Sequence, residues 1–430
     1  MNLKNLMDDN YLTFYMLSDK YIDDQYTTIN IPVHVLKKIF RYIKKILFHF
    51  YVSFRHYSSI KDQKNKIIYY AITKNNFDSL YPVYKETKKN SVMISSDYRL
   101  AKNAVLLPQI FPLIFSIFLI PRFIKNIIDS VPNVRKGIIL YLDDTLLSMG
   151  FKIFVKIYLK ILKPKAIVFA NYHSFPARSL IKSAECMNIP CFYIQHSAMT
   201  EIFPPIISSY ALLEGKDSLK KCYPDGYSKN KVFLIGSPKF DEHKENINTN
   251  HRVKKIGICS TPSMNKDQVL KLIEKQKEVF SNDSIIFRPH PSDHINNKYK
   301  NQSIIDSVNY SDPLKEETFQ FLRNVDAIIS GNSSILLDAA IMNVFPILWR
   351  DSHTTNKYNE KEDPNDKYGF VKNGLAISCN SIDQINECLI VIIDEKPNVR
   401  LKAKYYVENI NTNWDGRSAH YAATIIKKNI

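Results

Sequence analysis

The sequence predicts an α/β protein with two Rossmann-like, doubly wound domains that face a cleft, preceded by a basic N-terminal helical extension. First, the chain has 430 residues, which is too long for one ordinary hydrophobic core. Second, short apolar runs alternate with helix-length segments from residue 66 onward, as parallel sheets with both faces covered require. Third, the polar, periodless stretch 236–252 separates two such series and predicts a linker.

These observations divide the chain into four expected regions. They are a basic amphipathic extension (1–65), an acceptor domain (66–240), a nucleotide-binding domain (241–410) and a C-terminal helix that packs back on the first domain (411–430). Strands of the first sheet are expected at 67–73, 91–95, 137–142, 166–170, 191–194, 209–213 and 232–235. Strands of the second sheet are expected at 255–259, 284–287, 327–330, 345–349 and 374–377.

The N-terminal extension is both hydrophobic and basic. In residues 33–66 apolar side chains recur at three- and four-residue steps, and lysines and arginines fill the positions between them. Such a helix is suited to the interface of an anionic membrane, and a basic surface helix docked on its own domain fits equally well. The formal net charge of +17 favours an acidic partner, but no nucleic-acid-binding motif accompanies it, so nucleic acid is not expected.

One further apolar run, 104–120, is as short as a spanning helix can be, and Pro108 and Pro112 interrupt it. A buried helix, or one that touches lipid, is therefore expected rather than a span. The beginning of the chain is polar and shows no secretory signal, and the six cysteines show no metal or disulfide spacing. We expect a cytoplasmic protein, peripheral at the inner face of the membrane, with no metal and no cofactor.

The second predicted sheet ends in polar side chains that suit an anion. Residues 331–334 (GNSS) lie between a strand and a helix, where backbone N–H groups and the hydroxyls of Ser333 and Ser334 favour phosphate, although plain N-capping is the alternative. Two other strands of that sheet end in residues 288–291 (RPHP) and in Ser260-Thr261. Expected donor-phosphate ligands are His290, Ser333, Ser334, Arg288, Ser260 and Thr261, and expected nucleoside contacts are Pro289, Asn332 and Asp338.

The first predicted sheet ends in titratable residues. Asp143 and Asp144 follow the expected strand 137–142, and two adjacent carboxylates can raise one another's pKa, although one of them can instead cap the next helix. His196 follows the strand 191–194 and is a competing general base. His173 and Glu201 are weaker candidates that suit acceptor binding.

Two segments of the second domain resemble a known superfamily. The sequence FRPHP (287–291), followed by SGNSSILLDAAIMNVFPIL (330–348), is similar to the C-terminal domain of GT-B glycosyltransferases with HP and SS motifs. These include bacterial sialyltransferases and polysialyltransferases, Kdo-type capsule or lipopolysaccharide transferases and, more distantly, teichoic acid glycerophosphotransferases. The segment YIQHS (193–197) looks like the Q-H-G loop of several of them.

The resemblance implies that His290, Ser333 and Ser334 contact the donor phosphate. Sialyltransferase-like members take the base from a D/E-D/E-G motif, to which Asp143-Asp144-Thr145 is the nearest match, with threonine in place of glycine. Relatives with the Q-H-G loop favour His196 instead.

The expected function is inverting transfer of a sugar from a nucleotide-sugar donor to a hydroxyl of a glycan or lipid-linked glycan, in cell-surface polysaccharide or lipopolysaccharide synthesis. The resemblance favours a CMP-linked nonulosonic acid or Kdo as the donor sugar. The alternatives are a CDP-glycerol or CDP-ribitol glycerophosphotransferase, a UDP-sugar 2-epimerase and a non-enzymatic basic protein that binds membranes or nucleic acid.

Overall fold

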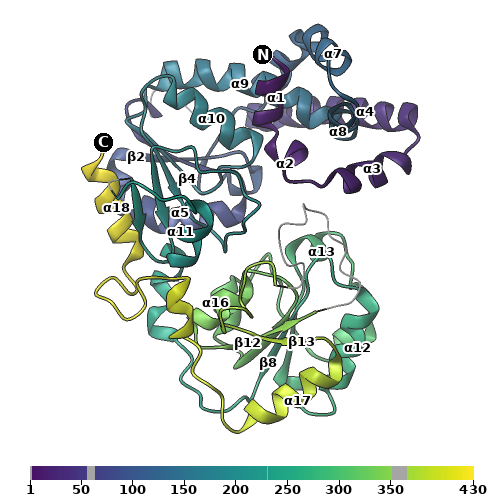
Figure 1. Ribbon diagram of the computed structural model, residues 1–430, viewed down its shortest axis with the longest axis vertical. Helices are drawn as coiled ribbons and strands as arrows, with labels where there is room; N and C mark the ends of the chain where they lie inside the picture. Colours follow the sequence, from purple (N-terminus) through teal and green to yellow (C-terminus); the bar gives the residue numbers. More distant parts are fainter. Residues whose placement is uncertain (1, 56–62, 230, 351–365) are drawn as a thin grey trace.

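A computed structural model describes residues 2–55, 63–229, 231–350 and 366–430 (Figure 1). It contains two parallel sheets, one above the other in the figure, each covered by helices. The predicted fold class, two Rossmann-like α/β domains in a GT-B-like arrangement, is confirmed.

The first sheet has the strand order β3-β2-β1-β4-β5-β6-β7, and all its pairs are parallel. Its strands are β1 (Ile67–Ala71), β2 (Ser91–Ser95), β3 (Val105–Leu106), β4 (Ala166–Phe169), β5 (Cys191–Ile194), β6 (Tyr210–Leu213) and β7 (Val232–Leu234). The helices beside it are α5 (Lys74–Thr87), α9 (Leu142–Leu162), α10 (Phe175–Glu185) and α11 (Lys216–Cys222). Strands β1, β2, β4 and β5 are buried along their whole length, as a sheet covered on both faces requires.

The second sheet has the order β10-β9-β8-β11-β12-β13, again with parallel pairs. Its strands are β8 (Ile256–Cys259), β9 (Ile285–Arg288), β10 (Asn309–Tyr310), β11 (Ala327–Ser330), β12 (Phe345–Trp349) and β13 (Ile377–Cys379). Its helices are α12 (Lys266–Gln276), α13 (Pro291–Ile295), α14 (Ser303–Asp306), α15 (Thr318–Leu322), α16 (Ile335–Ile341) and α17 (Ile382–Ile393). Short 3-10 helices include η4 (Pro238–Asn246), which leads from the first domain into the second.

The strand predicted at 137–142 is wrong. Those residues end α8 (Pro132–Leu140) and begin α9, and Ile138 is buried against a cluster of helices that includes Leu6, Tyr42 and Leu113. A short apolar run cannot distinguish a buried strand from a buried helix, and here β1 already pairs with β4. The predicted buried run 104–120 becomes β3 followed by a helix, α6.

Among the described residues, seven helices outside the two sheets form what we call the helical layer, at the upper right of Figure 1. They are α1 (Leu3–Asp9), α2 (Tyr11–Phe14), α3 (Asp19–Thr27), α4 (Ile31–Arg55), α6 (Ile110–Phe118), α7 (Ile120–Ile128) and α8. The layer is seated on α9 at Gly150, where an added Cβ would lie 2.1 Å from the carbonyl oxygen of Pro112 and 2.2 Å from Ser116 Oγ. Only glycine allows α6 and α9 to approach so closely.

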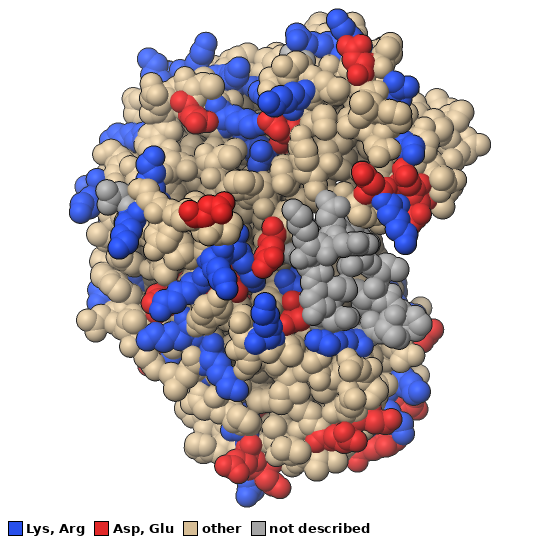
Figure 2. All heavy atoms as spheres, in the orientation of Figure 1, with Lys and Arg blue, Asp and Glu red and all other residues tan. Residues whose placement is uncertain are grey.

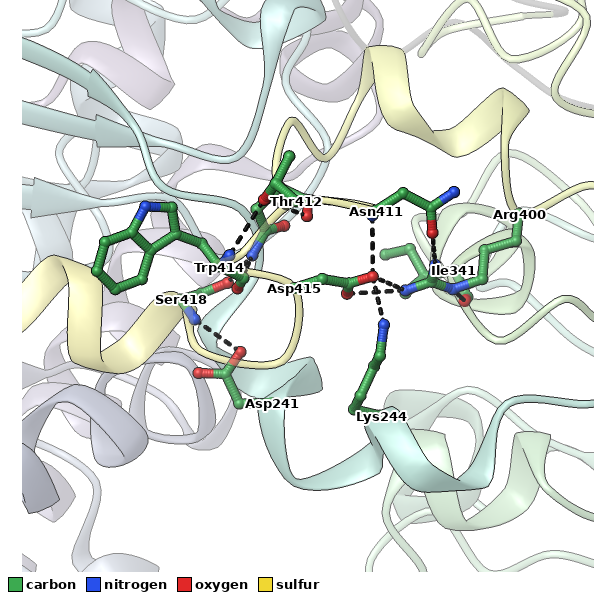
Figure 3. Close-up of polar contacts among 10 residues, drawn as sticks. Asp241, Lys244, Ile341, Arg400, Asn411, Thr412, Trp414, Asp415 and Ser418 are labelled. Carbon is green, nitrogen blue, oxygen red and sulfur yellow. Dashed lines mark hydrogen bonds and ion pairs between the residues drawn. The ribbon is translucent and has the colours of Figure 1, made fainter.

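The end of the chain ties the two domains together (Figure 3). Helix α18 (Ser418–Lys428) lies beside the first domain, and Asp241 in η4 accepts hydrogen bonds from the backbone N–H groups of Ser418 and Ala419, at 2.9 and 2.7 Å. Just before α18, the buried carboxylate of Asp415 pairs with Lys244 and with Arg400, whose Nη2 lies 2.8 and 3.0 Å from its two oxygens. These pairs join the second domain to the segment that leads into α18.

Candidate functional site

Three loops of the second domain lie side by side. Arg288 at the end of β9 is in register with Cys259 of β8, which is in register with Ser330 of β11. The segments that follow these residues, 260–264, 289–291 and 331–334, therefore leave the same edge of the sheet. The last approaches the first closely, because a Cβ added to Gly331 would lie 3.1 Å from Thr261 Oγ1.

His290 is held in one orientation at the start of α13. Its Nδ1 accepts the backbone N–H of Ser292 at 3.2 Å, and the Ser292 hydroxyl lies 2.8 Å from the same nitrogen. A ring that accepts at Nδ1 carries its proton on Nε2 when neutral. Burial lowers the pKa of His290, which favours this neutral form. His290 can therefore donate one hydrogen bond from Nε2 to an anion.

Two residues expected to hold phosphate are used inside the protein instead. The guanidinium of Arg288 is buried and donates to Ser311 Oγ and to the carbonyl oxygen of Glu316, at 2.5 and 2.9 Å. The hydroxyl of Ser260 donates to Asp293 at 2.7 Å and accepts the N–H of His290 at 3.0 Å. These contacts support the loop around His290, and both side chains are engaged within the second domain.

The two serines are differently engaged. Ser333 Oγ accepts the backbone N–H of Ile335 at 3.4 Å, a long contact, whereas Ser334 precedes α16 and makes no capping hydrogen bond through its side chain. Both are partly exposed. The predicted neighbours Thr261 and Pro289 are buried, and Asn332 Oδ1 accepts the backbone N–H of Lys367 at 3.2 Å. The hydroxyls of Ser333 and Ser334 are thus the accessible donors of this turn.

Asp338 faces the first domain rather than an open surface. Its Oδ1 lies 2.8 Å from Lys239 Nζ in η4, and both side chains are largely buried, with 9% and 14% of their areas exposed. Burial acts to lower the pKa of Lys239, but the carboxylates of Asp338 and Glu214 raise it overall. In this conformation the carboxylate of Asp338, which we expected to contact the nucleoside, is paired with Lys239 across the domains.

Glu214 is a titratable residue that the sequence reasoning missed. It follows β6 directly, is 2% exposed, and its Oε2 lies 3.3 Å from Gln195 Nε2. Burial raises its pKa to about 7, and Lys239 opposes that rise. The sequence did contain a signal for Glu214, because it follows the apolar run 211–213 directly and so stands at the carboxyl end of a predicted strand.

The two histidines of the first domain follow neighbouring strands, β4 and β5. Burial lowers the pKa of His173 to about 3, with a contribution from His196, and lowers that of His196 to about 4, with a contribution from Lys239. His173 stacks on Phe203, with ring centroids 4.7 Å apart. Glu201, by contrast, is exposed and is near enough to Asp217 to raise the pKa of that carboxyl, to which burial contributes more.

Several buried polar atoms at this edge lack a hydrogen-bond partner among the described residues. They are His173 Nδ1, Ser174 Oγ, His196 Nδ1 and Thr200 Oγ1. An unpaired buried polar atom costs about 1–3 kcal/mol, so native proteins seldom gather them without a purpose. These atoms all follow β4 or β5, at the carboxyl edge of the first sheet.

Asp143 and Asp144 are not part of this edge. They occupy the first turn of α9, and Asp143, which is fully buried, accepts hydrogen bonds from Arg41 at 2.7 and 2.5 Å and from Lys45 at 2.9 Å. Burial acts to raise the pKa of Asp143, but Arg41, Lys45 and Lys38 hold it far below its usual value. The expectation that both follow a strand is wrong, and a carboxylate so strongly paired is a poor proton acceptor.

The described part of the chain contains no group of three or more His, Cys, Asp or Glu residues that could hold a metal ion. Two surface pockets, of about 460 and 300 Å³, lie elsewhere: one between α5, η4 and the start of α18, the other beside Trp349 and α12. Neither is lined by a residue of the segments 260–264, 289–291 and 331–334, or by His173, His196 or Glu214.

The fold is similar to that of solved nucleotide-sugar enzymes. The UDP-GlcNAc 2-epimerase from Methanocaldococcus jannaschii aligns with a TM-score of 0.54 and 14% identity, covering 84% of this chain and 99% of that one. The Neisseria meningitidis UDP-GlcNAc 2-epimerase bound to UDP-GlcNAc gives 0.54 and 13%, covering 84% and 100%. S. aureus MnaA in complex with UDP gives 0.51 and 11%, covering 85% and 96%. No family model and no curated protein matches the sequence.

Proposed function

We propose that this protein is an inverting glycosyltransferase that moves a sugar from a nucleotide donor to a hydroxyl of a cell-surface glycan. In this proposal the second domain binds the donor phosphate through His290 Nε2 and the hydroxyls of Ser333 and Ser334. The first domain binds the acceptor near His173, and His196 or Glu214 takes the proton of the attacking hydroxyl.

The proposal is carried by the ion pair between Lys239 and Asp338. Asp338 lies four residues after Ser334, so the two share one face of α16, about 6 Å apart along its axis. Lys239 also influences the pKa of both Glu214 and His196. These links support our proposal that groups able to accept a proton face the hydroxyls that suit a leaving phosphate, as a direct displacement requires.

The proposed roles of the phosphate-binding donors and of the general base follow from the charges that develop in the reaction. A departing nucleotide carries negative charge, and neutral donors aimed at it stabilise that charge without a metal ion. A base with a pKa near 7 is half ionised at neutral pH, which suits proton transfer from a sugar hydroxyl. Glu214 fits this requirement more closely than His196 does, because the pKa of His196 is about 4. Glu214 is therefore our preferred base.

The donor class can be tested by ligand-induced stabilisation. A nucleotide at a hundred times its Kd stabilises the folded state by about 2.7 kcal/mol, which raises Tm by a few degrees. From the HP and SS motifs we expect CMP to raise Tm more than UDP, CDP or GDP. The double variant Ser333→Ala/Ser334→Ala should lose the shift. The matched variant Ser281→Ala/Ser284→Ala, which alters two serines just before β9 that hydrogen-bond to each other, should keep it.

A second candidate is a UDP-sugar 2-epimerase, which the likeness to two such folds over more than four-fifths of the chain favours. The two reactions differ in what they need. An epimerase converts UDP-GlcNAc with no acceptor present, whereas a transferase turns over its donor only when an acceptor hydroxyl is supplied. Stabilisation by UDP alone, with acceptor-free conversion of UDP-GlcNAc, would replace our proposal by this one. Failure of all four nucleotides to raise Tm would remove both.

The acceptor in our proposal is a glycan held at the membrane, and we place the protein peripherally at its cytoplasmic face. The net charge of +17 supports this location, because the inner leaflet carries anionic lipid.

A further inference from the structure

Helix α4 packs its basic face on the protein and exposes its apolar face. A surface helix normally packs its apolar face on the protein and exposes its charges. In α4, three of the basic residues, Lys38, Arg41 and Lys45, reach Asp143, at 3.3, 2.5 and 2.9 Å. The apolar face is thereby left on the outside. The buried carboxylate of Asp143 accounts for this orientation.

The exposed face of α4 is large. Leu36, Phe40, Leu47 and Phe50 have 60–67% of their areas exposed. Ile39 and Ile43 add 45% and 47%. At 100° per residue these side chains fall within one arc of about 100° along the helix. A contiguous apolar stripe of this kind on the outside of a protein marks an interaction surface.

The neighbouring α6 and α7 add to the exposed apolar side chains of the same layer, since Phe123 of α7 is buried in one cluster with Tyr42 of α4. Phe118, at the bend between α6 and α7, is 78% exposed. Ile120, Ile124 and Ile128 form a stripe at four-residue steps that is 39–67% exposed. In the described part of the chain no single helix has the length and hydropathy to cross a bilayer, and only α6 and α7 together qualify, across a 64° bend.

Basic residues accompany both stripes. Lys37, Lys44 and Arg55 of α4, and Arg122 and Lys125 of α7, are exposed. Neither α4 nor the segment 110–128 contains an acidic residue. In the view of Figure 2, Lys and Arg side chains are spread over both domains. The cations lie next to the apolar stripes, so a partner must offer negative charge beside an apolar interior.

We infer that the helical layer docks on an anionic lipid bilayer, with α4 lying in the interface and the bend between α6 and α7 dipping into it. We call the side chains Leu36, Ile39, Phe40, Ile43, Leu47, Phe50 and Phe118, with their flanking lysines and arginines, the lipid-facing surface. Apolar side chains enter the acyl boundary while the cations remain among the headgroups. A second copy of the chain fits less well, because it would bring the same cations together. The inference is independent of the reaction proposed above.

Co-sedimentation with vesicles tests the inference without any substrate. The full chain should bind vesicles of equal parts phosphatidylglycerol and phosphatidylcholine, and should bind pure phosphatidylcholine much more weakly. The triple variant Leu36→Ser/Phe40→Ser/Leu47→Ser should lower the partition coefficient about a hundredfold. Its matched control, Ile390→Ser/Val391→Ser, removes two side chains that are 62% and 76% exposed on α17 and should change nothing.

The charges are tested separately. Lys37→Gln/Lys44→Gln should weaken binding to the anionic vesicles by about fivefold for each charge removed, and increasing salt should remove that difference. The control Lys402→Gln/Lys404→Gln changes two exposed lysines of the second domain and should have no effect. All substituted side chains are exposed, so Tm should be unaltered, and near-unchanged Tm values establish that the variants fold.

Three outcomes would overturn the inference. The first is equal binding of the wild-type chain and the triple serine variant. The second is equal binding to neutral and anionic vesicles. The third is a dimer in sedimentation velocity that the triple variant abolishes, with no vesicle binding by the wild-type chain. That result would assign the surface to a second copy.

Discussion

Lys239 Nζ lies 2.8 Å from Asp338 Oδ1, so that the segment leaving the first domain is tied to the first turn of α16 in the second. A cation at this position balances two buried carboxylates, because Glu214 also acts on it. The pair therefore both joins the domains and sets the charge around the proposed base.

Removing the cation should destabilise the protein. Lys239→Met leaves Asp338 without its partner in a largely buried position, for which we expect a loss of about 3 kcal/mol in the free energy of unfolding. Urea denaturation measures this loss. Lys275→Met, which breaks an exposed pair with Glu278, should cost far less. Equal costs for the two variants would show that the interdomain pair is not buried in solution.

The pH dependence of kcat/KM should identify the base. Burial raises the pKa of Glu214 to about 7, so a Glu214 base is inactive when protonated and activity should rise with pH around 7. His196, with a pKa of about 4, is already neutral there and contributes no rise near 7. Glu214→Gln should remove that limb and most of the activity. A wild-type profile that rises only around pH 4 would transfer the role to His196.

Asp143 should matter for stability and for the seating of α4, not for the chemical step. Asp143→Asn should lower the free energy of unfolding by about 2 kcal/mol, because Lys38, Arg41 and Lys45 lose their shared counter-charge. Limited proteolysis should then cleave within α4 sooner than in the wild-type chain. In detergent solution kcat should stay within about twofold of wild type. A loss of kcat of a hundredfold or more without a change in stability would restore Asp143 as a catalytic residue.

The same carboxylate predicts an acid limit for the helical layer. The pKa of Asp143 is lower in the folded than in the unfolded state, so its stabilising contribution is complete above its ordinary value and is lost as the pH falls through the folded value. The wild-type chain should therefore lose stability between pH 5 and lower pH more steeply than Asp143→Asn does. Parallel urea titrations at each pH make this comparison, and parallel slopes would contradict it.

The contact between α6 and α9 depends on a missing side chain. Gly150→Ala would place a Cβ 2.1 Å from the carbonyl oxygen of Pro112, which is backbone and can move only with α6. We expect a loss of about 3 kcal/mol or more. In Gly137→Ala the nearest atom is the far end of the Phe14 ring, at 2.9 Å, and a small rotation can relieve the contact. Thermal unfolding should show a clear difference between these two variants, and similar Tm values would contradict the close packing.

The two-sheet architecture could be predicted from the sequence pattern. Buried parallel strands appear in a sequence as short apolar runs, and helices appear as segments in which apolar residues recur every three or four positions. The strand prediction at 137–142 was wrong because a short apolar run does not by itself identify a strand. Six apolar residues fit a buried helix as well as a strand, and only the helical layer, with Tyr42 and Leu113 against Ile138, decides between them. Asp143 then follows a helix instead of a strand, and its role changes with its neighbours.

By itself, then, the sequence determined the alternation of strands and helices, the turns after β9 and β11, and the hydrophobic and basic character of residues 33–55. Tertiary structure alone decided which carboxylates are paired and which stay available. Asp143 and Glu214 look alike in the sequence, yet one is surrounded by three cations and the other is buried beside a single lysine. The pKa of a carboxyl group depends on the charges and the solvent within a few ångströms, and contacts as distant in sequence as Arg41 with Asp143 arise only when the chain folds.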